Sequence, residues 1–146
     1  MSDLRIEQPA SDPQLEDWRY VHNVIIPTHV LSSGDVRERA QRHHLEVAYL
    51  GDEVVGCSTV RPPTADTRTA TVIARVLAAH RRQGFGEELY ARGLHRAREL
   101  GSEVIETVVL SCNLDGLRFA QKHGFVQIDR YLLPGDTIPW IDLRLA

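Results

Sequence analysis

The sequence is poor in the residues that metal centres, disulfide frameworks and membrane spans require. Its 146 residues include only Cys57 and Cys112 as cysteines, too few for a disulfide framework and without C-x-x-C spacing. The seven histidines are scattered, and the neighbours His43 and His44 cannot face one ligand from a helix or strand. No apolar run approaches the roughly 20 residues of a membrane-spanning helix. We therefore expect no metal and no membrane partner.

Lysine is also scarce, because Lys122 is the only one and the other basic residues are arginines. A net charge of −3 gives no reason to expect nucleic-acid binding. The segment Met1–Arg5 lacks a basic region followed by an apolar run, so no signal peptide is predicted. With so few cysteines, the chain fits a reducing cytoplasm. Its length and its 42% apolar content predict one globular domain over residues 1–146.

Hydrophobic periodicity predicts a mixed α/β chain without repeats. Strands are expected at residues 4–7, 45–50, 53–60, 69–77, 102–110, 125–132 and 139–145, and helices at 13–23, 35–43, from the glycine turn to about 100, and 114–122. Strand 102–110 follows strand 69–77 through a helix, so the right-handed crossover rule predicts that the two are parallel. The apolar segment 25–31 either packs or lines a pocket.

The most informative stretch runs from Val76 to Leu89, where a buried strand meets a tight glycine turn and a helix start. Gly84 and Gly86 allow a ligand to approach the backbone closely. The N–H groups of Gln83–Glu87 are unpaired donors at the positive end of the helix, a geometry that binds phosphate. The pair Arg81-Arg82 adds cationic groups that suit a pyrophosphate.

Other motifs with glycine turns do not fit this stretch. The second glycine is not followed by Lys and Ser or Thr, which excludes a Walker A loop. Leu89 stands where the third glycine of a dinucleotide fingerprint belongs. The simpler interpretation is a surface turn in which the glycines only provide tightness.

Two segments carry a family resemblance. Arg81-Arg82-Gln83-Gly84-Phe85-Gly86 resembles the Q/R-x-x-G-x-G/A motif of the GNAT (N-acetyltransferase) superfamily. Asn113 followed by Phe119-Ala120-Gln121-Lys122-His123-Gly124-Phe125 is similar to the family's N-x-x-A-x-x-x-Y-x-K-x-G-F. The match is good from Leu45 onward, whereas the earlier residues match only in element order. The resemblance implies a mixed, mostly antiparallel sheet with helices on both faces and a V-shaped opening between two central parallel strands.

The resemblance also implies acetyl-CoA as cosubstrate and no metal. The pyrophosphate would lie at the glycine turn, the pantetheine arm would pair with the end of the strand, and Asn113 would lie near that arm, although it is equally read as a helix cap. The residues implied to bind the cosubstrate are Val76, Leu77, Ala78, Arg81, Arg82, Gln83, Gly84, Phe85, Gly86, Glu87 and Asn113. The backbone N–H of Val76 or Leu77 would polarise the thioester carbonyl.

The proton-transfer groups are left open, because the sequence departs from the family pattern here. Ala120 stands where many relatives carry Tyr, so that role cannot be carried over. The alternatives for the acid are Tyr131, Ser111, Cys112 or water. Strand 69–76 has no carboxylate to act as base, which makes water the default and Glu106 an alternative, while His80 is interpreted as structural or exposed.

The acceptor is expected between segments Asn23–Ser32 and Tyr131–Trp140, with His29, Tyr131 and Trp140 as candidate lining residues. The leading hypothesis is an N-acetyltransferase that acts on a primary amine of a small molecule by direct attack. The alternatives are a non-catalytic acyl-CoA-binding sensor and a protein N-acetyltransferase. The C-terminal strand is a candidate edge for a homodimer.

Overall fold

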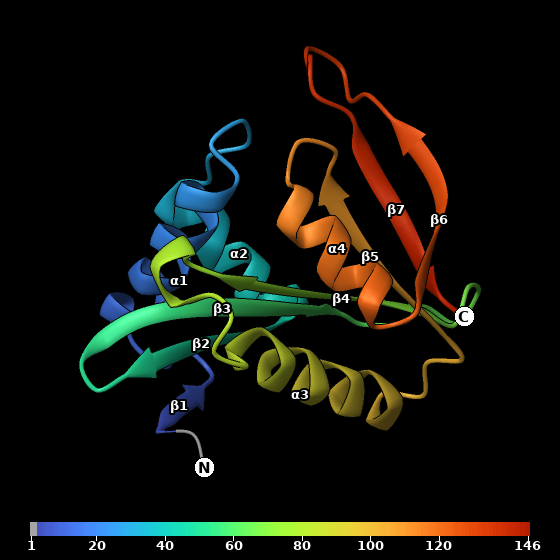
Figure 1. Cartoon of the computed structure of the whole chain (residues 1–146). Helices are drawn as coiled ribbons and strands as arrows, with labels where there is room; N and C mark the ends of the chain where they lie inside the picture. Colours follow the sequence, from blue (N-terminus) through green and yellow to red (C-terminus); the bar gives the residue numbers. More distant parts are fainter. Residues whose placement is uncertain (1–2) are drawn as a thin grey trace.

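The computed structural model describes residues 3–146, and its strands form one mixed sheet (Figure 1). The elements are β1 (Leu4–Glu7), α1 (Asp12–Ile25), α2 (Ser33–Arg42), β2 (His44–Leu50), β3 (Glu53–Arg61), β4 (Thr69–Val76), the 3₁₀ turn η1 (Ala78–His80), α3 (Phe85–Glu99), β5 (Val104–Leu110), α4 (Leu114–Lys122), β6 (Phe125–Tyr131) and β7 (Trp140–Leu145). The sheet order is β1-β2-β3-β4-β5-β7-β6. The predicted order of strands and helices is confirmed; residues 1 and 2, on which the signal-peptide prediction partly rests, lie outside the described residues.

Capping side chains set where the first two helices begin. Ser11 accepts a hydrogen bond from the backbone N–H of Gln14, and a proline stands in the first turn of α1. The second helix begins two residues earlier than predicted, because the cap is Ser32. Its side chain and that of Asp35 form a reciprocal capping box.

The two faces of the sheet carry different helices. Helices α1 and α2 lie over one face of β2–β4, and α3 runs along the opposite face (Figure 1). On the first face Trp18 is fully buried and donates from its indole nitrogen to the backbone oxygen of Ser58. On the second face α3 lies so close to β4 that a Cβ added at Gly93 would stand 2.5 Å from Cγ1 of Val72.

Strands β4 and β5 are parallel neighbours that separate along their length. They pair only where Thr69–Thr71 meets Val104–Glu106. Both strands continue beyond these pairs, β4 to Val76 and β5 to Leu110, without pairing to each other. The V-shaped opening expected between the central strands is therefore present.

One expectation about the sheet edges is wrong. The C-terminal strand β7 pairs with β5 on one side and β6 on the other, so it has no free edge. The free edge on this side of the sheet belongs to β6. A homodimer stays a prediction, and one that forms through this edge of the sheet would use β6 rather than β7. Within residues 3–146 there is no helix of the length and apolar character that crossing a membrane requires.

Candidate functional site

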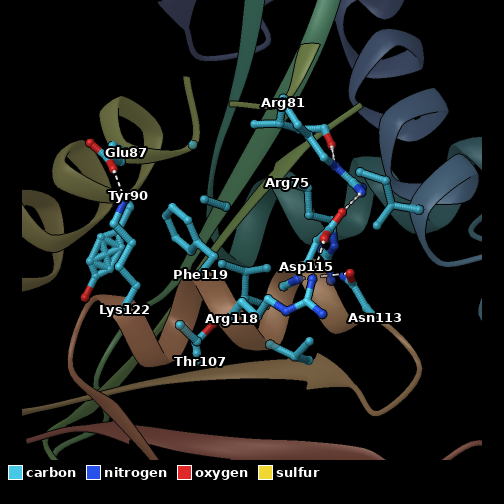
Figure 2. Close-up of a pocket in the computed structure, with 18 of the residues that line it drawn as sticks. Arg75, Arg81, Glu87, Tyr90, Thr107, Asn113, Asp115, Arg118, Phe119 and Lys122 are labelled. Atoms are coloured by element: carbon cyan, nitrogen blue, oxygen red, sulfur yellow. Dashed lines mark hydrogen bonds and ion pairs between the residues drawn. The ribbon is translucent and has the colours of Figure 1, made fainter. Parts of the chain in front are cut away.

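A cavity of about 370 Å³ occupies the opening between β4 and β5. Ile25 and Ile26 line it from the end of α1, and Gly84 and Gly86 line it from the start of α3. Further residues come from β4, β5 and α4, including Asn113 (Figure 2). Because α1 and α3 lie on opposite faces of the sheet, the cavity connects the two faces. The apolar segment near Ile25 thus both packs and lines a pocket.

The glycine turn presents a row of free backbone donors to this cavity. Arg82 and Gly84 have positive φ values of 64° and 83°. Within the described chain, none of the N–H groups from Arg82 to Glu87 has a hydrogen-bond partner, and Glu88 is the first to bond back, to the oxygen of Gly84. A turn of this kind at a helix N-terminus forms a concave site for anions.

The two arginines of the turn have different surroundings. Arg81 donates from Nε to the backbone oxygen of Val76 at 2.9 Å, and its Nη1 pairs with Asp115 Oδ2 at 3.1 Å (Figure 2). Arg82 is exposed and has no ion pair with any residue from 3 to 146. Of the two, Arg82 is the cation available to a ligand at the turn.

The end of β4 differs from the prediction in two ways. The strand ends at Val76, and Ala78 belongs to η1 instead of continuing the strand edge. The N–H of Leu77 donates to the oxygen of Val55 at 2.9 Å, so it cannot polarise a carbonyl in the cavity. Hydrogen-bonded pairs alternate in an antiparallel ladder, so the preceding residue, Val76, points its N–H away from β3 and toward the opening. Val76 remains as the candidate donor.

Helix α4 forms the wall of the cavity opposite β4. The Oδ1 atom of Asn113 accepts from the N–H of Gly116 at 3.0 Å, which confirms the predicted helix cap. Phe119 lies against the start of α3, because a Cβ added at Gly86 would meet its ring at 3.3 Å. Lys122 pairs with Glu87 at 3.3 Å, which joins the two helices.

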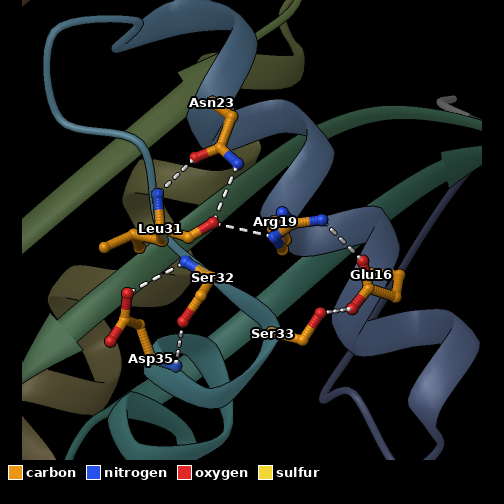
Figure 3. A network of polar contacts seen from close by, with 7 residues as sticks. All are labelled: Glu16, Arg19, Asn23, Leu31, Ser32, Ser33 and Asp35. Carbon is orange, nitrogen blue, oxygen red and sulfur yellow. Dashed lines mark hydrogen bonds and ion pairs between the residues drawn. The ribbon is translucent and has the colours of Figure 1, made fainter.

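The segments expected to wall the acceptor side meet in the structure. The Asn23 side chain holds both the N–H and the oxygen of Leu31, and Arg19 donates to the same oxygen at 2.7 Å (Figure 3). His29, in the loop between α1 and α2, contacts the loop between β6 and β7, where its Nε2 lies 2.9 Å from Asp136 Oδ2. Its ring centroid lies 5.3 Å from that of Trp140.

Tyr131 lies on this side with a partner that sequence reasoning missed. Its hydroxyl donates to Asp142 Oδ1 at 2.8 Å. Burial and this hydrogen bond raise the pKa of Tyr131 to about 12, so the phenol stays protonated. Burial also raises the pKa of Asp142, and the nearby carboxylates of Glu106 and Asp129 add to the effect. The sequence signal that could have indicated Asp142 is the alternation in β7, which puts residues 140, 142 and 144 on one face.

Three of the other side chains considered for proton transfer have ion-pair partners or lie exposed. His80 pairs with Glu53 at 3.2 Å, and Glu106 pairs with Arg144 at 2.6 Å. Cys112 is exposed. Sequence reasoning also missed Arg75, a partly buried arginine in the apolar strand β4 that lines the cavity.

One buried and one half-buried histidine, His22 and His43, make the fold sensitive to acid. Burial lowers the pKa of His22 to about 4, helped by the charge of Arg75, and burial lowers that of His43 to about 4 as well. The folded state thus binds fewer protons than the unfolded state below the unfolded pKa of about 6.5. We expect the free energy of unfolding to be greatest above that pH and to fall toward pH 4, with His22 contributing about 1 kcal/mol per pH unit.

Urea unfolding at successive pH values between 7 and 4.5 measures this effect. The His22→Gln variant removes one titrating group, so its stability should fall less steeply than that of the wild type. Equal slopes for the two proteins would contradict the assignment.

The chain matches a known family over most of its length. Residues 4–125 match the model of the acetyltransferase (GNAT) family. A putative acetyltransferase, yncA, from Salmonella typhimurium, solved with acetyl-CoA, is 16% identical with TM-score 0.77, over 99% of this chain and 94% of that one. A putative phosphinothricin N-acetyltransferase is 22% identical with TM-score 0.78, over 97% of each chain. A ribosomal-protein-alanine N-acetyltransferase from Brucella melitensis is 16% identical with TM-score 0.76, over 96% of this chain and 98% of that one. No curated protein matches the chain.

Proposed function

This chain belongs to the acetyltransferase (GNAT) family, and from that premise we propose that it transfers the acetyl group of acetyl-CoA to the primary amine of a small molecule. The observation that carries the proposal is the cavity that connects both faces of the sheet between β4 and β5. Donor and acceptor can therefore enter from opposite faces and meet in the opening.

The donor end of the cavity fits a pyrophosphate and its pantetheine arm. The free N–H groups from Arg82 to Glu87 would hold the phosphates, with Arg82 as counter-charge. The unpaired edge of β4 at Val76 and the Asn113 side chain border the path of the arm. Bound there, acetyl-CoA supplies an acyl group already activated as a thioester.

The reaction proposed is direct attack by the neutral amine. Its nitrogen forms the new C–N bond, the C–S bond breaks, and sulfur leaves as a thiolate that takes up a proton while nitrogen loses one. The Val76 N–H faces the opening, where it can stabilise negative charge on the carbonyl oxygen. The acidic residues that line the cavity, Glu87 and Asp115, are ion-paired at the donor end, so water is the proposed carrier of the amine proton.

A small acceptor is favoured over a peptide by the closure of the acceptor side. The contact of His29 with Asp136 joins the α1–α2 loop to the β6–β7 loop. The bonds of Asn23 and Arg19 to Leu31 hold the first loop in place. A peptide needs an open groove, whereas these contacts bridge the two segments that would border one.

An acceptor panel tests the proposal. Purified protein is mixed with acetyl-CoA and, in turn, simple amines, amino acids, and peptides with a free α-amine or a lysine, and release of free thiol is followed. We expect turnover with small amines. Turnover with peptides alone would indicate a protein N-acetyltransferase. CoA binding with no turnover at all would favour the sensor hypothesis.

A further inference from the structure

Three arginines in this chain are shielded from solvent without an ion pair. Arg39, Arg61 and Arg75 are all partly buried, and within residues 3–146 none of them lies in an ion pair with Asp or Glu. The other arginines that lack an ion pair are exposed: Arg37, Arg82, Arg98 and Arg130. A shielded cation without a counter-ion is costly, so these three need an explanation.

The three arginines gather on the acceptor face of the sheet. Arg75 lies directly opposite Cys57 in the β3–β4 ladder, and Cys57 packs against α1 and α2. Side chains two residues apart share a face, so Arg61 points the same way from the end of β3. Arg39 comes from α2, which covers this face. Burial lowers the pKa of Arg75 to about 10, and repulsion by Arg61 and Arg39 adds to the effect.

Acidic side chains attract two of the three arginines without forming an ion pair with either. Asp35 and Glu38 attract Arg39 in this way from α2. Burial raises the pKa of the Cys57 thiol to about 12, so it stays uncharged. Asp142, which attracts Arg61 from β7, accepts its hydrogen bond from Tyr131 and forms no ion pair with the arginine. The Nε atom of Arg61 is buried with no partner, as is Nε1 of Trp140 on the same face. Of the three arginines, Arg75 is the one that lines the cavity, so it is the one that a ligand in the cavity can contact.

We propose that the acceptor is an amino acid, a small molecule whose amine enters the opening while its carboxylate is bound by Arg75, with Arg39 and Arg61 adding positive charge behind it. The inference rests on the proposed function and names the substrate class for the same site. Arg75 lines the cavity and adjoins Val76, whose N–H faces the opening. A carboxylate on Arg75 thus lies within the length of one small molecule from the reacting amine.

Matched acceptors and one variant test the inference. Each of the twenty amino acids is compared with its carboxamide, and phenylalanine and leucine also with phenethylamine and 3-methylbutylamine, which lack the carboxyl group. In the wild type we expect kcat/KM to be about 100-fold higher for preferred amino acids than for their neutral analogues. Arg75→Met should remove most of this difference by lowering the rate for amino acids alone. Arg37→Gln, which changes an exposed arginine of α2, is the matched control.

A folding measurement excludes trivial loss of structure. The positive charges of Arg61 and Arg39 repel Arg75. Without ligand, the Arg75→Met protein should therefore unfold at the same or a higher urea concentration than the wild type. A variant that is as stable as the wild type but has lost its preference for carboxylates supports an anion site.

Two results would overturn the inference, and they are separate from failure of the proposed function. Equal kcat/KM for amino acids and neutral amines in the wild type would reject the anion site but leave the acetyltransferase activity established. Turnover with acidic peptides alone would likewise reject an amino acid as the acceptor while leaving that activity established. If no acceptor turns over, calorimetry with CoA present still decides. The site is supported if amino acids bind the wild type more tightly than their amides do, and if this difference is lost in Arg75→Met. Equal or absent binding of the two rejects it.

Discussion

Replacement of Gly84 by glutamate is expected to weaken CoA binding about 100-fold or more, because it puts a negative charge among the donors proposed for the pyrophosphate. Gly84 has a φ of 83°, and a Cβ there would meet no atom within 4 Å. The new side chain therefore has room, and the backbone strain costs roughly 1–2 kcal/mol of stability. The protein should fold while its phosphate site repels phosphate.

Gly51→Glu is the matched control for this variant. Gly51 also has a positive φ, 64°, and open space around its Cβ position, but it lies in the turn between β2 and β3. Both variants introduce the same charge and a similar backbone strain. Titration calorimetry with CoA should show near wild-type affinity for Gly51→Glu and a much weaker affinity for Gly84→Glu. Equal affinities for both variants would mean that the turn does not hold the phosphates.

The second large effect is expected on folding. Gly56→Ala should lower the free energy of unfolding by about 3 kcal/mol, because its Cβ would stand 2.6 Å from the backbone oxygen of Arg75 and 3.2 Å from Cδ1 of Leu89. Leu89 can adjust its side chain, but the oxygen can move only with β4 itself. Because β4 forms one side of the opening, the same change should also weaken CoA binding.

Gly34→Ala serves as the control for the second effect. In α2 the nearest atom to an added Cβ is the Ser32 hydroxyl oxygen at 3.8 Å, so alanine fits and helix propensity favours it. Urea unfolding should give equal or greater stability for Gly34→Ala and a clear loss for Gly56→Ala. A loss below about 0.5 kcal/mol for Gly56→Ala would contradict the close packing of β3 on β4.

Local signals in the sequence were enough to predict most of the fold. Asn113 was interpreted as a helix cap, and it caps α4. The crossover rule predicted that β4 and β5 are parallel, and they are. These features depend on residues close together in the chain or on a general rule of handedness, which is why the sequence reveals them.

The features that were missed depend on contacts between distant residues. The N–H of Leu77 is occupied by Val55, and nothing in the local sequence indicates that bond. The insertion of β7 between β5 and β6 is a matter of sheet order, which alternation alone does not determine. The arginine cluster joins Arg39, Arg61 and Arg75 from three elements, and each looks like an ordinary surface cation in sequence.

Transfer of an acetyl group from acetyl-CoA to an amine can be followed directly with labelled acetyl-CoA. The wild-type protein is incubated with acetyl-CoA carrying a ¹³C-labelled acetyl group and with a mixture of amino acids and simple amines, and free thiol and labelled products are quantified together. We expect labelled N-acetyl product and free CoA in equal amounts, with the label on amino acids. Free CoA without a labelled amine, or no release of CoA above the protein-free rate, would contradict it.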